Sequence, residues 1–118
     1  MNAELRLRRV YEAPAPEDGR RVLVDRLWPR GLTRDAARLD EWLKDVAPTT
    51  ALRHWYGHRP ELFDEFRDRY LVELADPEPA AALGRLRELS GAGTLTLLTA
   101  TKDVGLSHLT VLAELLRG

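Results

Sequence analysis

The sequence predicts an α/β domain in which a mainly parallel sheet is flanked by helices. Two short apolar runs, at residues 21–25 and 94–100, have the composition of strands that are buried on both faces. Segments with the apolar spacing of helices lie between these runs and after the second one. Strands that alternate with helices in this way join into parallel sheets. At 118 residues the chain has the length of one domain, so residues 1–118 are predicted to fold as a single unit.

The N-terminal part is predicted to contain two strands and a connecting loop. Residues 5–11 partly alternate between polar and apolar side chains, as a half-buried strand does. Residues 12–19 hold two prolines and an Asp-Gly pair, which indicate an exposed loop closed by a turn. The strand at 21–25 must end before Pro29 and Gly31, which do not continue a ladder. The sequence does not determine whether the Trp28-Pro29 peptide bond is cis or trans.

The middle of the chain predicts short helices. Thr33 is placed to cap a helix that runs through Arg38, and Thr50 is a candidate cap for the next helix, which Gly57 breaks. Residues 39–46 are ambiguous between strand and helix.

Three longer helices follow. Pro60 suits the first position of a helix to about residue 75. Its predicted buried stripe is Leu62, Phe63, Phe66, Tyr70, Leu71 and Leu74. Asp76 and Pro77 start another helix, which Gly91 or Gly93 ends, and Ser107 caps the last one.

Composition excludes several classes of site and protein. The chain has no cysteine, which excludes disulfides, thiolate metal sites and cysteine nucleophiles. A net charge of −1 argues against a basic nucleic-acid coat. No apolar stretch approaches the roughly 20 residues that span a bilayer, so no membrane partner is expected. Residues 1–6 lack the apolar region of a signal peptide, which predicts a cytoplasmic protein.

Two polar segments are predicted to meet at one edge of the sheet. Ligands of open α/β sheets bind beyond the carboxyl ends of the strands. If the two buried strands are parallel neighbours, residues 25–31 share that edge with residues 99–103 and with Ser107 and His108. This convergence is the basis of the predicted site.

The first segment offers groups that recognise anions and rings. Arg26 and Arg30 can clamp a phosphate or carboxylate, Trp28 can stack on a ring, and Asp25 can accept a proton. A scaffold role is equally consistent with these residues. In that interpretation Asp25 pairs with Arg26 or Arg30, and Trp28 closes the sheet edge.

The second segment adds an anion-binding helix start. Lys102 and the free amides that follow Ser107 favour negative charge, and His108 or Asp103 can transfer protons. An ordinary capped helix with a surface Lys–Asp pair is the alternative.

A metal or haem site is a further alternative. His54 and His58 are four residues apart, the spacing of two ligands on one helix, and His108 is the third histidine. Gly57 is expected to break the helix between them, so we predict no metal ligand. The sequence does not identify a cofactor.

Five motifs resemble the DUF488 family, and its YeaO-like branch most closely. They are R-V-L-V-D-R-L-W-P-R-G at 21–31, W-L-K-D-V-A-P at 42–48, L-R-x-W-Y-x-H at 52–58, F-x-x-R-Y-x-x-E-L at 66–74 and L-T-L-L-T-A-T-K-D at 95–103. The resemblance covers nearly the whole chain in order. It implies a small, stand-alone bacterial or archaeal α/β protein, and it assigns no reaction. Other branches carry a Cys after the second strand and a Cys-His-Arg before the last helix. Thr99 and Ser107-His108-Leu109 stand at those places here, which argues against thiol chemistry.

The leading functional hypothesis is therefore a protein that binds a small anionic ligand, such as a nucleotide, at the sheet edge. Hydrolase or transferase activity would use Asp25, Asp103 or His108 for protons. The alternatives are a nucleic-acid accessory module, the metal or haem protein, and an interaction protein without a pocket. The oligomeric state is not predicted.

Overall fold

A four-stranded sheet, in which every neighbouring pair of strands is parallel, organises the structure, a computed structural model that describes residues 4–118. The strand order is β1-β4-β2-β3. The strands are β1 (Leu5–Arg9), β2 (Arg20–Leu23), β3 (Glu41–Trp42) and β4 (Leu95–Thr99). The two buried runs are parallel neighbours, as predicted, with Val22 opposite Leu97. The predicted α/β class is confirmed.

The helices occupy the segments that the apolar spacing indicated. They are α1 (Arg34–Ala37), α2 (Thr50–Tyr56), α3 (Phe63–Glu73), α4 (Pro77–Ala92) and α5 (His108–Arg117). The ambiguous segment 39–46 contains both β3 and a short 3₁₀ turn at Lys44–Val46. Every peptide bond of the described residues is trans, including Trp28-Pro29. None of the helices within residues 4–118 combines the length and apolar character that a membrane crossing requires.

Helix capping follows the sequence with one correction. Thr33 accepts a hydrogen bond from the amide of Ala36, and Ser107 accepts one from Leu109. The predicted cap at Thr50 is wrong, because Thr49 has the extended backbone and its hydroxyl accepts from the Leu52 amide. A residue inside the first turn cannot reach that amide in the same way.

The buried stripe of α3 also needs a correction. Phe63, Phe66 and Tyr70 are buried as predicted, whereas Leu71 is 38% exposed. Leu71 lies one residue beyond Tyr70, about 100° around the helix, so it leaves the face that packs on the sheet. Residues 60–62 form a 3₁₀ turn before the helix.

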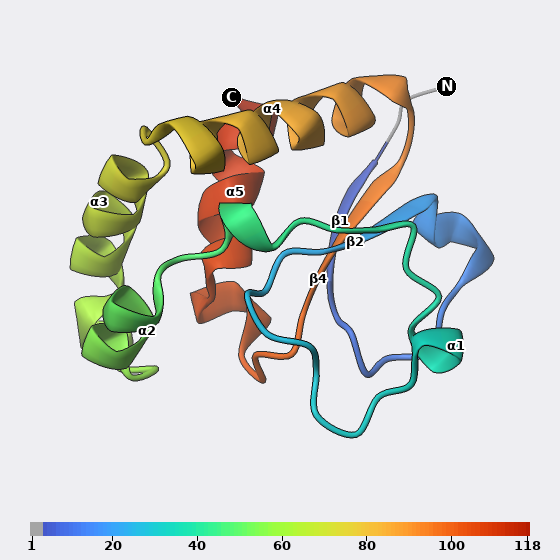
Figure 1. The fold of residues 1–118 in the computed structure, drawn as a ribbon, viewed down its shortest axis with the longest axis horizontal. Coiled ribbons are helices and arrows are strands. Elements are labelled where there is room, and N and C mark those ends of the chain that lie inside the picture. The colour runs from blue at the N-terminus through green and yellow to red at the C-terminus, as the bar shows by residue number, and fades with distance from the viewer. Residues whose placement is uncertain (1–3) are drawn as a thin grey trace.

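The two faces of the sheet are covered differently. Figure 1 shows α2, α3, α4 and α5 on one side of the strands and α1 on the other. The helical side packs on Val22, Val24, Leu95 and Leu97. On the opposite side, Leu23 and Leu98 lie in a smaller cluster with Trp28 and Trp42. Alternate residues of one strand therefore serve two separate cores.

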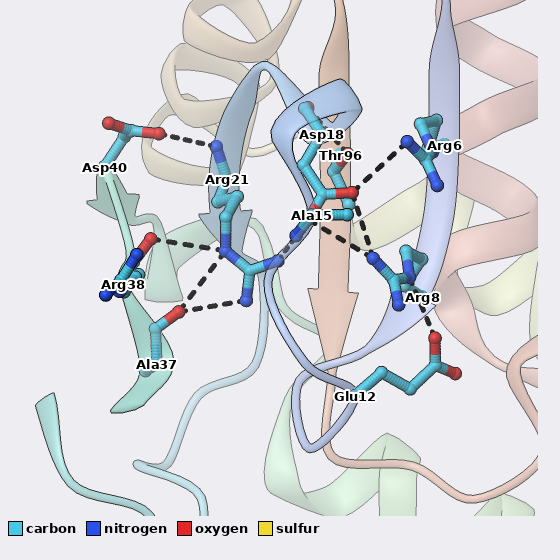
Figure 2. A network of polar contacts seen from close by, with 10 residues as sticks. All are labelled: Arg6, Arg8, Glu12, Ala15, Asp18, Arg21, Ala37, Arg38, Asp40 and Thr96. Atoms are coloured by element: carbon cyan, nitrogen blue, oxygen red, sulfur yellow. Dashed lines mark hydrogen bonds and ion pairs between the residues drawn. The ribbon is translucent and has the colours of Figure 1, made fainter. Parts of the chain in front are cut away.

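On the second face, near the amino-terminal ends of the strands, the loop between β1 and β2 places the buried carboxylate of Asp18 against the sheet. Asp18 is 1% exposed and is surrounded by guanidinium groups, 2.6 Å from Arg21, 3.0 Å from Arg8 and 3.4 Å from Arg6 (Figure 2). Its backbone carbonyl accepts a hydrogen bond from Thr96 on the central strand β4. These contacts fix the loop between β1 and β2 on the sheet.

Met1, Asn2 and Ala3 lie outside the described residues. The signal-peptide prediction rests partly on these three residues.

Candidate functional site

The carboxyl ends of β2 and β4 are joined through the side chain of Asp25. One carboxylate oxygen accepts a hydrogen bond from the Thr99 hydroxyl at 2.7 Å. The other accepts from the backbone amide of Ala100, also at 2.7 Å. The two polar segments therefore meet at one edge of the sheet, as the sequence predicted.

His108, the first residue of α5, lies directly beside Asp25. Its Nε2 atom is 2.9 Å from the carbonyl oxygen of Val24 and 3.3 Å from Oδ1 of Asp25. Both neighbours are acceptors, so Nε2 carries the hydrogen and donates it. Within residues 4–118, no hydrogen bond reaches Nδ1 of His108. That atom is the one that the imidazole can offer to a ligand.

Asp25 is ionised at neutral pH. Burial would raise its pKa, but the hydrogen bond and positive charge of His108 outweigh this effect, together with the Ala100 amide and the Thr99 hydroxyl. The net result is a pKa below the ordinary value for an aspartate. Asp25 can therefore accept a proton or stabilise a cation, and it has no proton to donate at pH 7.

A cavity of about 260 Å³ opens between α2 and the start of α5. Its wall combines one guanidinium and three imidazoles with aromatic and apolar side chains. The lining residues are Pro48, Arg53, His54, Tyr56, Gly57, His58, Phe66, Thr101, Leu106, Ser107 and His108. No carboxylate of the described residues belongs to this lining. We call this the first cavity.

A second cavity of about 890 Å³ adjoins the first, and the two share Arg53, His58 and Thr101. Its wall carries charges of both signs. The lining residues are Arg9, Glu12, Asp25, Arg53, His58, Ala100, Thr101, Lys102, Asp103 and Val104. The two cavities together form one cleft along the carboxyl edge of the sheet.

All four site residues predicted after β4 line this cleft. Lys102 and Asp103 border the second cavity, and Ser107 and His108 border the first. The Ser107 hydroxyl is already engaged, since it accepts from the Leu109 amide and donates to the Val104 carbonyl. Asp25 reaches the cleft from β2.

The three other predicted residues lie elsewhere. Arg26 donates its guanidinium hydrogens to the carbonyls of Ala47 and Pro48. The Arg30 side chain is exposed, outside both cavities. Trp28 crosses to the opposite face of the sheet and packs edge-on against Trp42, with ring centroids 5.4 Å apart.

The physical reason is the direction of the chain after β2. Trp28 joins the smaller core with Leu23 and Leu98, and its indole donates to the Leu32 carbonyl at 2.7 Å. With this packing, residues 28–32 lie outside the lining of both cavities. Sequence spacing could place the segment at the sheet edge but could not tell which face each side chain takes.

Sequence reasoning missed Arg53 and Arg9 as residues of the cleft. Arg53 lies on α2 and borders both cavities, and Arg9 ends β1. A signal for Arg53 was present, because it belongs to the L-R-x-W-Y-x-H motif together with His58. Arg9 carried no signal of its own, since it reaches the cleft only through the pairing of β1 with β4.

The histidines do not form a metal-ligand cluster. Gly57, at φ 55°, ends α2, and His58 at φ 57° turns away from the helix, as the sequence predicted. No group of three or more His, Asp or Glu side chains in residues 4–118 has an arrangement that would hold a metal ion.

Comparison with known proteins gives relatives without assigned activity. An uncharacterized protein of Mycobacterium tuberculosis is 54% identical over 114 residues, which cover 97% of this chain and 94% of the relative. The uncharacterized protein YeaO of Escherichia coli is 40% identical over 113 residues, 96% of each chain. No solved structure matches the chain at a significant level.

A family model described as the inactive DUF488-N3 subclade matches residues 4–118. The match spans every strand and helix that builds the cleft, and the resemblance of the five motifs is confirmed. The chain therefore belongs to the DUF488 family, within the subclade that is described as inactive.

Proposed function

We propose that this protein binds a small anionic ligand in the cleft and holds it without covalent catalysis. The observation that carries this proposal is the wall of the first cavity. It presents Arg53 and three imidazoles and, among the described residues, no carboxylate. A wall that carries a guanidinium and imidazole side chains and no carboxylate is complementary to an anion.

The chemistry of the wall suits an oxyanion with a small apolar part. The Arg53 guanidinium can donate two parallel hydrogen bonds to a carboxylate or phosphate. Tyr56 and Phe66 supply apolar surface on the same wall. His108 is buried, whereas Arg53, His54 and His58 are exposed. The ligand would thus meet the exposed side chains first and the buried imidazole last.

The hydroxyl groups near the cleft favour binding over covalent chemistry. Thr99 donates its hydroxyl hydrogen to Asp25, but its side chain is fully buried and no substrate can reach it. Ser107 is also buried, and its hydroxyl donates to the Val104 carbonyl, which is not a base. A nucleophilic hydroxyl needs both a base that takes its proton and access to the substrate. The description of the subclade as inactive agrees with this proposal.

Thermal denaturation with added sulfate tests the proposal. Sulfate should raise the melting temperature of the wild type by several degrees, because a ligand that binds only the folded state stabilises it. Arg53→Gln should lose this shift. Arg87→Gln is the matched control, because Arg87 is an exposed arginine on α4, outside both cavities.

Three results would overturn the proposal. The first is a sulfate shift that Arg53→Gln retains. The second is an oligonucleotide that binds with steep salt dependence and is indifferent to Arg53→Gln, which would favour a nucleic-acid module instead. The third is turnover of a phosphate ester or acyl ester that Asp25→Asn abolishes, which would show that the Asp25–His108 pair is catalytic.

A further inference from the structure

All three histidines of the chain line the first cavity. They come from different elements, because His54 lies on α2, His58 follows the glycine that ends α2, and His108 begins α5. Imidazole is the side chain whose charge changes most readily near neutral pH. The charge of this wall therefore depends on pH in a way that the Arg53 charge does not.

Other charges surround the three imidazoles from every adjoining element. Asp25 lies behind His108, at 3.3 Å from Nε2, and no ion pair connects His54 or His58 with a carboxylate of the described residues. The charged residues of the adjoining segments are Arg9 and Glu12 at the end of β1 and just after it, Asp25 beyond β2, Arg53 on α2, Arg59 and Glu61 after α2, and Lys102 and Asp103 beyond β4. Arg53 and the two exposed imidazoles line the same cavity, and neither imidazole forms an ion pair with a carboxylate of the described residues. His58 also borders the second cavity, whose wall includes Glu12, Asp25 and Asp103.

We infer that the first cavity binds a doubly charged oxyanion and that binding is coupled to proton uptake by its imidazoles. This inference rests on the proposed anion-binding function and specifies its ligand class and its regulation. A sulfate or a phosphate monoester fits this description. A monocarboxylate carries a single negative charge, so its binding would favour protonation of the imidazoles less.

The coupling follows from thermodynamic linkage. An anion binds more tightly to a wall of imidazolium groups than to a wall of neutral rings, so binding favours protonation. By reciprocity, a lower pH must strengthen binding. Each proton taken up changes the affinity by up to about tenfold per pH unit in the range where histidine titrates. Because His54 and His58 are exposed, added salt should weaken the coupling.

Isothermal titration calorimetry with inorganic sulfate tests the inference on the whole protein. Sulfate stays a dianion throughout the histidine range, so any proton taken up must enter the protein. Titrations at one pH in two buffers of different ionisation enthalpy give the number of protons per sulfate. We expect proton uptake on sulfate binding, and we expect affinity to fall at least about tenfold between pH 6 and pH 8.

Variants separate the imidazoles from the fixed charge. The double variant His54→Gln, His58→Gln keeps hydrogen-bond donors at both positions and should bind sulfate with a smaller proton uptake and a flatter pH profile. Arg87→Gln should retain the wild-type profile. Nitrate, a monoanion, should show weaker binding and less proton uptake than sulfate.

The outcomes distinguish this inference from the function on which it rests. Sulfate binding that is equal at both pH values, with no buffer-dependent heat, overturns the coupling and leaves anion binding intact. Nitrate that matches sulfate in affinity and proton uptake overturns the dianion class. The absence of any sulfate binding at either pH overturns both proposals. The wild-type titrations alone decide these points, even if the double variant fails to fold.

Discussion

Nε2 of His108 lies 3.3 Å from the Asp25 carboxylate at the meeting point of β2, β4 and α5. Asp25 also accepts hydrogen bonds from Thr99 and Ala100, so one carboxylate ties together three elements that are far apart in the sequence. The same pair borders the cleft. Its charge state therefore bears on stability and on binding at once.

Asp25→Asn should destabilise the fold in a pH-dependent way. Because the pKa of Asp25 lies below its unfolded value, near 3.9, its ionisation contributes stability above that value. The contribution is lost as pH falls through the folded pKa. We expect a cost of about 1–3 kcal/mol at pH 7 that shrinks below about pH 4. Urea denaturation at both pH values measures it.

Asp68→Asn, at an exposed position on α3, is the control for this prediction. It should change the free energy of unfolding by less than about 0.5 kcal/mol at either pH. An equal cost of Asp25→Asn at pH 7 and pH 3 would show that the hydrogen bonds matter and the ionisation does not.

Trp28→Ala should affect stability and leave sulfate binding unchanged. The half-buried indole packs against the smaller core beside Leu23, Leu98 and Trp42, so its removal takes away apolar contacts and costs roughly 2 kcal/mol. Leu27→Ala, at a position 69% exposed, should be nearly neutral. Chemical denaturation and sulfate titration of both variants check this. Loss of sulfate binding by folded Trp28→Ala would restore the sequence-based hypothesis of a stacking residue.

Asp18→Asn should be among the most destabilising single substitutions in the chain. Burial raises the pKa of Asp18. Hydrogen bonds from the Ala15 amide, Arg21 and Arg8 together lower it by more than burial raises it, so the net shift is downward. Loss of the charge leaves the buried guanidinium of Arg21 without its anion, which costs about 3–5 kcal/mol. Glu17→Gln, at the exposed neighbouring position, is the control. A cost below about 1 kcal/mol in urea denaturation would contradict this account.

The pH dependence of this second carboxylate has the same sign. The stability contributed by Asp18 is present above the unfolded pKa and is lost as pH falls through the lowered folded value. Acid unfolding of wild type and Asp18→Asn should therefore converge at low pH.

Two glycines with positive φ should respond differently to alanine. At Gly19 (φ +61°) a Cβ would lie 2.3 Å from the Thr94 carbonyl oxygen, whereas at Gly31 (φ +77°) nothing lies within 4 Å. Gly31→Ala should cost about 1–2 kcal/mol from backbone strain alone. Gly19→Ala should cost at least about 2 kcal/mol more, since backbone must move as well. Thermal denaturation compares the two, and equal costs would show that the loop at Gly19 moves freely.

The sequence by itself determined the class of fold and the edge at which the two polar segments meet. The apolar runs at β2 and β4 predicted two buried strands, and the structure pairs them side by side. That pairing forced Asp25 and the residues after Thr99 to meet, because parallel strands end at the same edge. The helix starts at Thr33 and Ser107 were equally local, since each cap depends on one hydroxyl and one nearby amide.

Tertiary structure alone decided which side chains face the cleft. Arg26, Trp28 and Arg30 follow β2 as predicted, but the burial of Trp28 against Leu23 and Trp42 carries the chain to the opposite face. The histidines and Arg53 gather in one cavity because α2 packs near the start of α5. Such clusters depend on the packing of residues that are distant in the sequence, and the local spacing of residues does not indicate that packing.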